Sequence, residues 1–294
     1  MGLAACPGRR GPVASRGGGI RGVDPGVDPR KGGRMESRMV FVAGAPRSGT
    51  TAVTRLLAAH TDVTLADAHG LGTSPDGKPT YESGIFIRIR DDDAVRARFA
   101  ALDGRTAVIV EKTPMHILHV DRIRRIFPGA RFILCHRPPL PCLRSWKKAR
   151  ATFLQHGSFA DACAVVARAL TALAAQCEAE DVAVVRFNPF MADPAGAGAA
   201  LLRHLDLDTA QLDQCLADMR DPALERVKGV VGESVLGGAT RLSAEEKALV
   251  AEICEPANAA VLARRPRLVI RPLRDGADRE HGQGARIGST DRGR

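Results

Sequence analysis

Residues 40–51 read Val-Phe-Val-Ala-Gly-Ala-Pro-Arg-Ser-Gly-Thr-Thr, and this stretch decides the fold. The apolar run 40–43 predicts a buried strand that ends at Gly44. Apolar residues then recur on one face over 50–60, which predicts a helix. A glycine-containing loop between a strand and a helix offers backbone N–H groups and a helix N-terminus to an anion. The stretch therefore predicts a phosphate-binding loop at the edge of a sheet.

The loop departs from the usual nucleotide-triphosphatase pattern at one position. Gly44 and Gly49 have the expected spacing, but Thr50 stands where that pattern has a lysine. The cation is found inside the loop instead, at Arg47. A guanidinium presents a planar fork of donors that fits phosphate or sulfate oxygens. The loop is therefore expected to hold a phospho-ester without the usual arrangement of magnesium and ATP.

Strand-like apolar runs and helical patterns alternate along the rest of the chain. We expect strands at 63–65, 107–110, 132–135 and 182–187, and helices at 115–126, 140–148, 159–180, 194–205 and 243–263. Ser243 and Glu246 have the spacing of a capping box at the start of the last helix. This alternation predicts an α/β protein, a three-layer phosphate-loop fold with a mainly parallel sheet flanked by helices.

Two charged clusters follow predicted strands, at the sheet edge where ligands of such folds bind. Glu-Lys-Thr-Pro at 111–114 comes directly after the strand at 107–110, so Lys112 is expected to face the crevice of the loop. Arg137 leaves the next strand, and Ser145 lies eight residues later on the following helix. An arginine and a hydroxyl make a reasonable second phosphate site. A solvated charged turn is the alternative for the first cluster, and the second is a weak indication by itself, because arginine is common after a strand.

The net charge of +10 suggests a polyanion as partner, but the charge sits at the two ends of the chain. Residues 1–38 and 264–294 each carry a net charge of +5, and 39–263 hold equal numbers of acidic and basic residues. This distribution argues against nucleic-acid binding. Segments rich in glycine and charge bury little surface, so 1–38 and 275–294 are expected to be disordered tails around one domain at 39–274.

The cysteines and histidines give no metal signature. Seven cysteines are scattered without a C-x2-C pair, which predicts free thiols. His116 and His119 lie three residues apart on a helix, but packing explains them at least as well, and no metal is expected. No signal peptide pattern is present, and the apolar stretch 160–177 is interrupted by arginine. We expect a cytoplasmic protein without a membrane partner.

Together the three motifs resemble the sulfotransferase family. They are Pro-Arg-Ser-Gly-Thr-Thr at 46–51, Glu-Lys-Thr-Pro at 111–114, and the run 128–138 with Ser145 in register. The likeness extends over residues 39–265 and is greatest to the carbohydrate, tyrosylprotein and bacterial branches. Members of the family move a sulfuryl group from 3′-phosphoadenosine-5′-phosphosulfate, here abbreviated PAPS, to a hydroxyl or an amine. The resemblance implies the same donor for this chain.

The resemblance also implies a role for each matching residue. Those that would hold the 5′-phosphosulfate are Arg47, Ser48, Gly49, Thr50 and Thr51. Arg137 and Ser145 would hold the 3′-phosphate, and Lys112 corresponds to the lysine that reaches the bridging oxygen and the moving sulfuryl group. Residues 227–232 are similar to a loop that covers the 3′-phosphate in cytosolic members, which carries over Lys228 and Gly229.

The sequence offers two candidates for the general base. Related enzymes place a glutamate shortly after the first helix, but this segment has none, and Asp67 and His69 bracket the expected position. His69 is the favoured hypothesis because an unperturbed imidazole, with a pKa near ~6.5, titrates near neutral pH. Glu82, Arg88 and Arg90 are candidates for lining the acceptor side.

The sequence thus predicts metal-independent transfer of a sulfuryl group from PAPS to a hydroxyl of a small-molecule or glycan acceptor. A kinase-like phosphoryl transferase and a non-catalytic nucleotide-binding protein are the alternatives. No motif identifies the acceptor or an oligomeric state.

Overall fold

The computed structural model describes residues 36–66, 82–149, 157–220 and 241–270. The chain divides into two units, 1–33 and 34–294, and every described residue belongs to the second. Both predicted tails lie outside the described residues, except that 36–38 are described and the first strand begins at Arg38.

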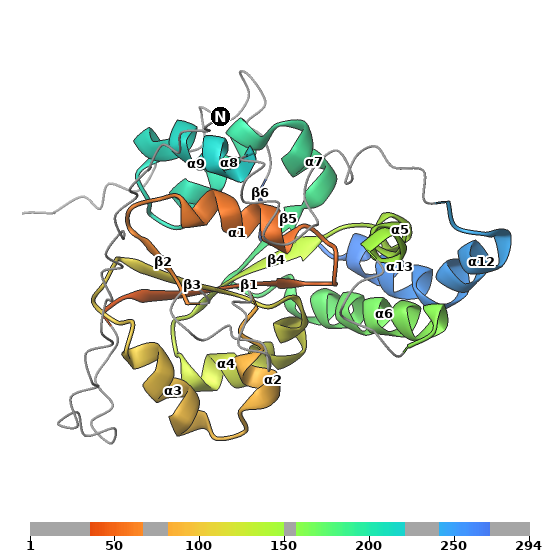
Figure 1. The fold of residues 1–294 in the computed structure, drawn as a ribbon, viewed down its shortest axis with the longest axis horizontal. Coiled ribbons are helices and arrows are strands. Elements are labelled where there is room, and N and C mark those ends of the chain that lie inside the picture. Colours follow the sequence, from red (N-terminus) through yellow and green to blue (C-terminus); the bar gives the residue numbers. More distant parts are fainter. Residues whose placement is uncertain (1–35, 67–81, 150–156, 221–240, 271–294) are drawn as a thin grey trace, which may run out of the picture. The chain divides into compact units, whose positions relative to one another are not determined.

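A six-stranded sheet forms the middle of the described structure, with the order β2-β3-β1-β4-β5-β6 (Figure 1). The strands are β1 Arg38–Gly44, β2 Val63–Leu65, β3 Val108–Lys112, β4 Arg131–His136, β5 Val182–Arg186 and β6 Leu268–Ile270. All neighbouring pairs are parallel. In the centre, Val42 is in register with Lys112 and Gly44 with Cys135, so the carboxyl ends of β1, β3 and β4 meet at one edge.

Helices cover both faces of the sheet, as Figure 1 shows. One face packs against α1 Thr50–Ala58, α7 Phe187–Ala192, α8 Pro194–His204 and α9 Leu212–Arg220. The other packs against α2 Ile85–Arg88, α3 Asp92–Ala100, the 3₁₀ helix η2 Pro114–His119, α4 Val120–Ile126, α5 Pro139–Ala149, α6 Phe159–Gln176, α12 Ala244–Ile253 and α13 Glu255–Ala263. A further 3₁₀ turn, η3 Thr209–Gln211, precedes α9. The expected three-layer α/β fold with a parallel sheet is confirmed.

One predicted helix is divided in the structure, and one predicted strand is longer than expected. The helix expected at 243–263 is two helices, because Pro256 lies in the first turn of α13 and has no N–H to continue α12. The capping box of Ser243 and Glu246 is present. The strand expected at 107–110 runs on to Lys112, so Glu111 and Lys112 are buried strand residues and not a turn.

The arginine in the apolar stretch 160–177 does not rule out a membrane span, because α6 meets the minimum length and composition for one. In the structure it behaves as a core helix. Seven of its residues are buried, and they join the cluster that lines the sheet, α12 and α13. A capping box at Ser158 and Asp161 starts this helix.

Candidate active site

The loop after β1 is shaped by two residues with positive φ. Gly49 has φ 101°, and a Cβ there would lie 2.1 Å from Cδ2 of Phe187. Arg47 has φ 69°, a conformation that costs energy for a residue with a side chain. Ser48 N–H donates to the carbonyl of Ala45 at 3.1 Å and closes the turn. The loop is therefore tightly packed, and only glycine fits at position 49.

Polar groups in this loop lack protein partners. The Ser48 side chain is fully buried, and its Oγ has no hydrogen-bond partner in the described part of the chain. Gly49 begins α1 without a side-chain cap, so no side chain caps the first N–H groups of the helix. Buried polar groups are nearly always hydrogen-bonded, and an orphaned hydroxyl at a helix N-terminus is typical of an anion site.

Two arginines meet beside this loop. Arg47 Nε donates to Ser145 Oγ at 3.1 Å, and Arg137 Nη1 donates to the Arg47 carbonyl at 3.3 Å. Arg137 is only 8% exposed, and its guanidinium stacks 4.4 Å from the centre of the Phe187 ring. Sequence reasoning paired Ser145 with Arg137, whereas the structure pairs its hydroxyl with Arg47.

The charges of the two guanidinium groups repel one another. Among the described residues, no carboxylate lies within ion-pair distance of either guanidinium. Burial, and next the charge of Arg137, lower the pKa of Arg47; burial likewise lowers the pKa of Arg137. The neighbouring Cys142 supplies no anion, because burial raises the pKa of its thiol to about 12. An anionic ligand would relieve this repulsion.

Lys112 ends β3 at the same sheet edge and is 1% exposed. Val108 and Val110 of β3 belong to the core cluster under α1, so the alternation of the strand puts Lys112 on the α1 side. Its Nζ lies 2.8 Å from Oε1 of Glu82, whose side chain is 20% exposed. The Glu82 charge also acts on Arg47, opposing the fall of its pKa. The charge of Glu82 thus acts on both Lys112 and Arg47.

Glu111, the neighbour of Lys112, belongs to the opposite face and is fully buried. Its Oε1 accepts from Ser83 Oγ and from Thr113 Oγ1, each at 2.7 Å. Its Oε2 lies at a hydrogen-bond distance of 2.7 Å from Nδ1 of His116. Burial raises the pKa of Glu111, but the charge of His116 and these hydrogen bonds outweigh it and hold the pKa below its ordinary value.

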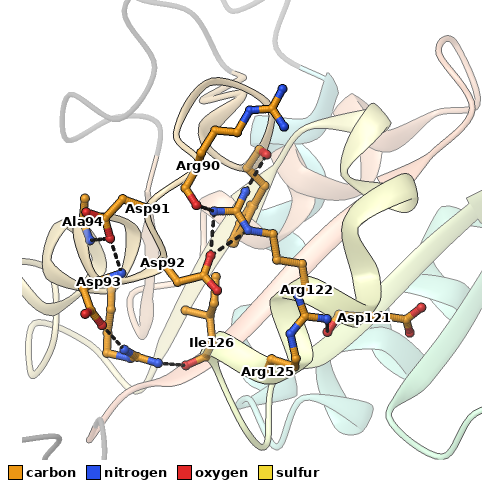
Figure 2. Close-up of polar contacts among 11 residues, drawn as sticks. Arg90, Asp91, Asp92, Asp93, Ala94, Asp121, Arg122, Arg125 and Ile126 are labelled. Carbon is orange, nitrogen blue, oxygen red and sulfur yellow. Dashed lines mark hydrogen bonds and ion pairs between the residues drawn. The ribbon is translucent and has the colours of Figure 1, made fainter.

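In the segment that follows Glu82, Arg90 and Asp92 contact Arg122 of α4 (Figure 2). Nη1 of this arginine donates to the carbonyl of Phe86 and Nη2 to that of Arg90, both at 2.9 Å. Nε and Nη2 also contact Oδ1 of Asp92 at 2.8 and 2.7 Å. Arg122 thereby connects α2, the residues after it and the start of α3 to one position on α4.

Most of the site residues expected from the sequence come together at the carboxyl edge of β1, β3 and β4. These are Arg47, Ser48, Gly49, Thr50, Thr51, Lys112, Arg137 and Ser145. Four others lie outside the described residues: Asp67, His69, Lys228 and Gly229. Sequence reasoning missed the ion pair of Lys112 with Glu82 and the Phe187 ring under Arg137, because both join residues far apart in the chain.

His116 and His119 do not form a metal site in the structure. Nδ1 of His116 lies at hydrogen-bond distance from Glu111. The His116 ring packs edge-on against the ring of Phe86, with 4.9 Å between their centres. In the described part of the chain, no group of three or more His, Cys, Asp or Glu side chains is arranged to hold a metal ion.

Comparison with known proteins identifies the family. A sequence model described as "Sulfotransferase family" matches residues 39–76 and 86–211, more than half of the chain. No curated protein matches.

Solved structures of sulfotransferases have a similar fold. One, from Alicyclobacillus acidocaldarius, is 17% identical with a TM-score of 0.50, and the match covers 79% of this chain and 95% of that one. A sulfotransferase from Mycobacterium avium is 15% identical with a TM-score of 0.47, covering 74% and 76%. The sulfotransferase domain of the Synechococcus PCC 7002 olefin synthase is 16% identical with a TM-score of 0.46, covering 75% and 96%.

At such low identity a structural likeness speaks for the fold alone. The family rests on the sequence match, which includes β1, the phosphate loop, Lys112, Arg137 and Ser145. The chain belongs to the sulfotransferase family, and it is an enzyme of sulfuryl transfer.

Proposed function

We propose that this enzyme transfers a sulfuryl group from PAPS to a hydroxyl group of a small-molecule or glycan acceptor. The observation that carries the proposal is a pair of arginines, the partly buried Arg47 and the buried Arg137, which has no ion-pair partner among the described residues and lies beside the orphaned hydroxyl of Ser48. Such a concentration of donors and charge fits a small, multiply anionic nucleotide.

The two ends of PAPS have counterparts among these residues. The 5′-phosphosulfate would be held by the loop and the start of α1, that is, by Arg47, Ser48, Gly49, Thr50 and Thr51. The 3′-phosphate would be held by Arg137 and Ser145, next to the same loop. Lys228 and Gly229 stay candidates for covering the 3′-phosphate. PAPS, when bound, supplies the sulfuryl group and a phosphate leaving group.

Lys112 is the residue that we propose to act on the reacting atoms. The leaving oxygen gains negative charge as its bond to sulfur breaks, so a cation nearby stabilises the transition state more than the ground state. Lys112 is buried at the end of β3, where water screens its charge little. Together with Arg47 and the loop N–H groups it would neutralise this developing charge.

For the proton of the acceptor hydroxyl, the structure adds a candidate to those found in the sequence. Glu82 lies 2.8 Å from Nζ of Lys112 and is partly exposed, so an acceptor oxygen near the sulfuryl group would be within its reach. We propose Glu82 as the general base. Asp67 and His69 remain the competing hypotheses, and rates of Glu82→Gln, His69→Ala and Asp67→Ala at saturating donor separate the three.

Transfer of a radiolabelled sulfuryl group from PAPS to a panel of phenols, alcohols and glycans tests the function. We expect transfer without added magnesium, and a loss of about 100-fold or more in kcat for Lys112→Met. A parallel reaction with labelled ATP and magnesium tests the kinase-like alternative, which the threonine at position 50 disfavours. Phosphoryl transfer from ATP without sulfuryl transfer from PAPS would reject the proposal.

A further inference from the structure

We propose that Glu111 is a positioning residue, which holds Glu82 opposite Lys112 through the hydroxyl groups of Ser83 and Thr113. The inference deepens the proposed function and rests on it for its kinetic consequences. It assigns a purpose to a buried carboxylate that cannot touch a substrate, since Glu111 is fully buried and faces away from the loop side of the sheet.

The first step is that Glu111 fixes Ser83, the residue next to Glu82. Ser83 Oγ donates to Glu111 Oε1 at 2.7 Å and accepts from the N–H of Ile85 at 3.1 Å. Its position is therefore determined both by the strand and by the first turn of α2. Ser83 is 1% exposed, so water does not compete for these bonds.

The second step is that Thr113 fixes the other side of the same turn. Thr113 Oγ1 donates to Glu111 Oε1 at 2.7 Å and accepts from the N–H of Gly84 at 3.1 Å. Gly84 has φ 58°, a left-handed conformation that turns the chain sharply between Glu82 and α2. One carboxylate oxygen thus holds two hydroxyl groups, and these hold two successive N–H groups of the turn.

The third step concerns the two sides of β3. Glu111 and Lys112 are adjacent in the strand and point to opposite faces. The turn at 83–84 is fixed to Glu111 on one face, while the carboxylate of Glu82 contacts Lys112 at the strand end. Any shift of the turn relative to β3 would change the distance of 2.8 Å between Glu82 Oε1 and Lys112 Nζ. A misplacement of about 1 Å can cost about 100-fold in rate.

Removing single hydroxyl groups tests the inference without leaving a buried charge unpaired. Ser83→Ala and Thr113→Val each remove one donor to Glu111, and Thr113→Ser keeps that donor while removing a methyl group. Thr64→Val is the matched control, because it removes a buried hydroxyl that accepts from Thr106 Oγ1 and has no contact with the site. Each variant is assayed for kcat, KM and binding of adenosine 3′,5′-bisphosphate.

We expect kcat to fall about 10- to 100-fold in Ser83→Ala and Thr113→Val, with nucleotide binding unchanged. Thr113→Ser should restore most of kcat, and Thr64→Val should have wild-type kcat with a similar loss of stability. The inference is wrong if the wild type transfers sulfuryl groups and Ser83→Ala and Thr113→Val have the same kcat as the control Thr64→Val. The proposed function would stand in that case.

A crystal structure of Ser83→Ala gives a readout that needs no activity. We expect the Glu82 carboxylate to move beyond 4 Å from Nζ of Lys112, the limit of an ion pair. An ion pair retained at its wild-type distance overturns the inference. If no acceptor is ever sulfated by the wild type, the proposed function fails, and this structure alone decides whether Glu111 positions Glu82.

Discussion

Phe187 touches both arginine-bearing parts of the site. Its ring packs so closely on Gly49 that no Cβ would fit, and the Arg137 guanidinium stacks on it. The ring is 6% exposed and lies at the first residue of α7, directly after β5. The Phe187 side chain therefore contacts both the phosphate loop and Arg137, and it restricts the position of one relative to the other.

This contact predicts the effect of a methyl group at position 49. Gly49→Ala adds backbone strain at φ 101° and a clash 2.1 Å from Phe187, so we expect a loss of about 2–5 kcal/mol in the free energy of unfolding. Gly129→Ala is the control, since Gly129 has φ 91° and nothing within 4 Å of its Cβ. This variant has the backbone strain without the clash, so we expect a loss of only about 1–2 kcal/mol in the free energy of unfolding. Equal losses in urea unfolding would show that Phe187 does not restrict the loop.

Some of the residues at this site can be predicted from the sequence, whereas contacts between distant segments cannot. The loop motif itself indicates Arg47 and Ser48, because strand, glycines and helix are consecutive in the chain. The ion pair of Lys112 with Glu82 joins residues 30 positions apart, and no periodicity fixes the segment before Glu82. The sequence indicates no buried role for Glu111, because a glutamate at the end of an apolar run is usually solvated.

At the scale of elements, the Arg122 cluster joins α4 to the connection between α2 and α3 (Figure 2). Two backbone carbonyls and one carboxylate depend on this guanidinium. Arg122→Met keeps the aliphatic stem and removes all three contacts, so we expect a loss of about 2–4 kcal/mol in the free energy of unfolding. Amide exchange over residues 85–93 should become faster.

Arg125→Met on the same helix is the control for this prediction. Arg125 is exposed and makes a single weak contact of 3.5 Å with the Asp121 carbonyl, so we expect a change within about 0.5 kcal/mol. Similar losses for both arginines would contradict the assignment of Arg122 as the anchor.

The boundaries of elements were predictable where a local rule decides them. Ser243 with Glu246 marks the start of α12, and the apolar runs locate β1, β4 and β5. Helix α3 gave no clear signal, because only Val95 and Phe99 of its nine residues are buried and the rest are mostly charged. Its start depends on a cap, Asp91, whose side chain accepts from two N–H groups.

For the whole molecule, three histidines that folding buries partly or fully predict how stability depends on pH. Burial lowers the pKa of His119, His136 and His204, so the folded chain binds fewer protons than the unfolded chain just below the ordinary pKa of ~6.5. Unfolding then takes up protons, and the free energy of unfolding should fall as pH drops from 7 towards 5. The slope is at most about 1.4 kcal/mol per pH unit for each proton.

Urea unfolding at pH 5, 6 and 7 measures this slope. His204→Gln removes one of the three groups, whose Nε2 is buried without a hydrogen-bond partner, and should reduce the slope. A free energy of unfolding that is flat or rises towards pH 5 would contradict the prediction.

The division of the chain into units predicts the effect of truncation. The chain divides into the units 1–33 and 34–294. Residues 39–263 carry no net charge, so the net positive charge of the protein comes from the two ends of the chain. Removing 1–33 and 275–294 should leave kcat and KM for sulfuryl transfer within about twofold of the full chain, because every residue of the proposed site is retained. A loss of transfer would assign the ends a part in catalysis.

The central claim is that the arginine pair and the loop form the PAPS site, and calorimetric titration with adenosine 3′,5′-bisphosphate, without magnesium, tests it most directly. We predict binding at one site and much weaker binding of adenosine 5′-monophosphate, which lacks the 3′-phosphate. Arg47→Met and Arg137→Met should each weaken binding at least about 10-fold, as loss of a charge-assisted hydrogen bond does. Equal affinity for the two nucleotides, or wild-type affinity in both variants, would contradict the account.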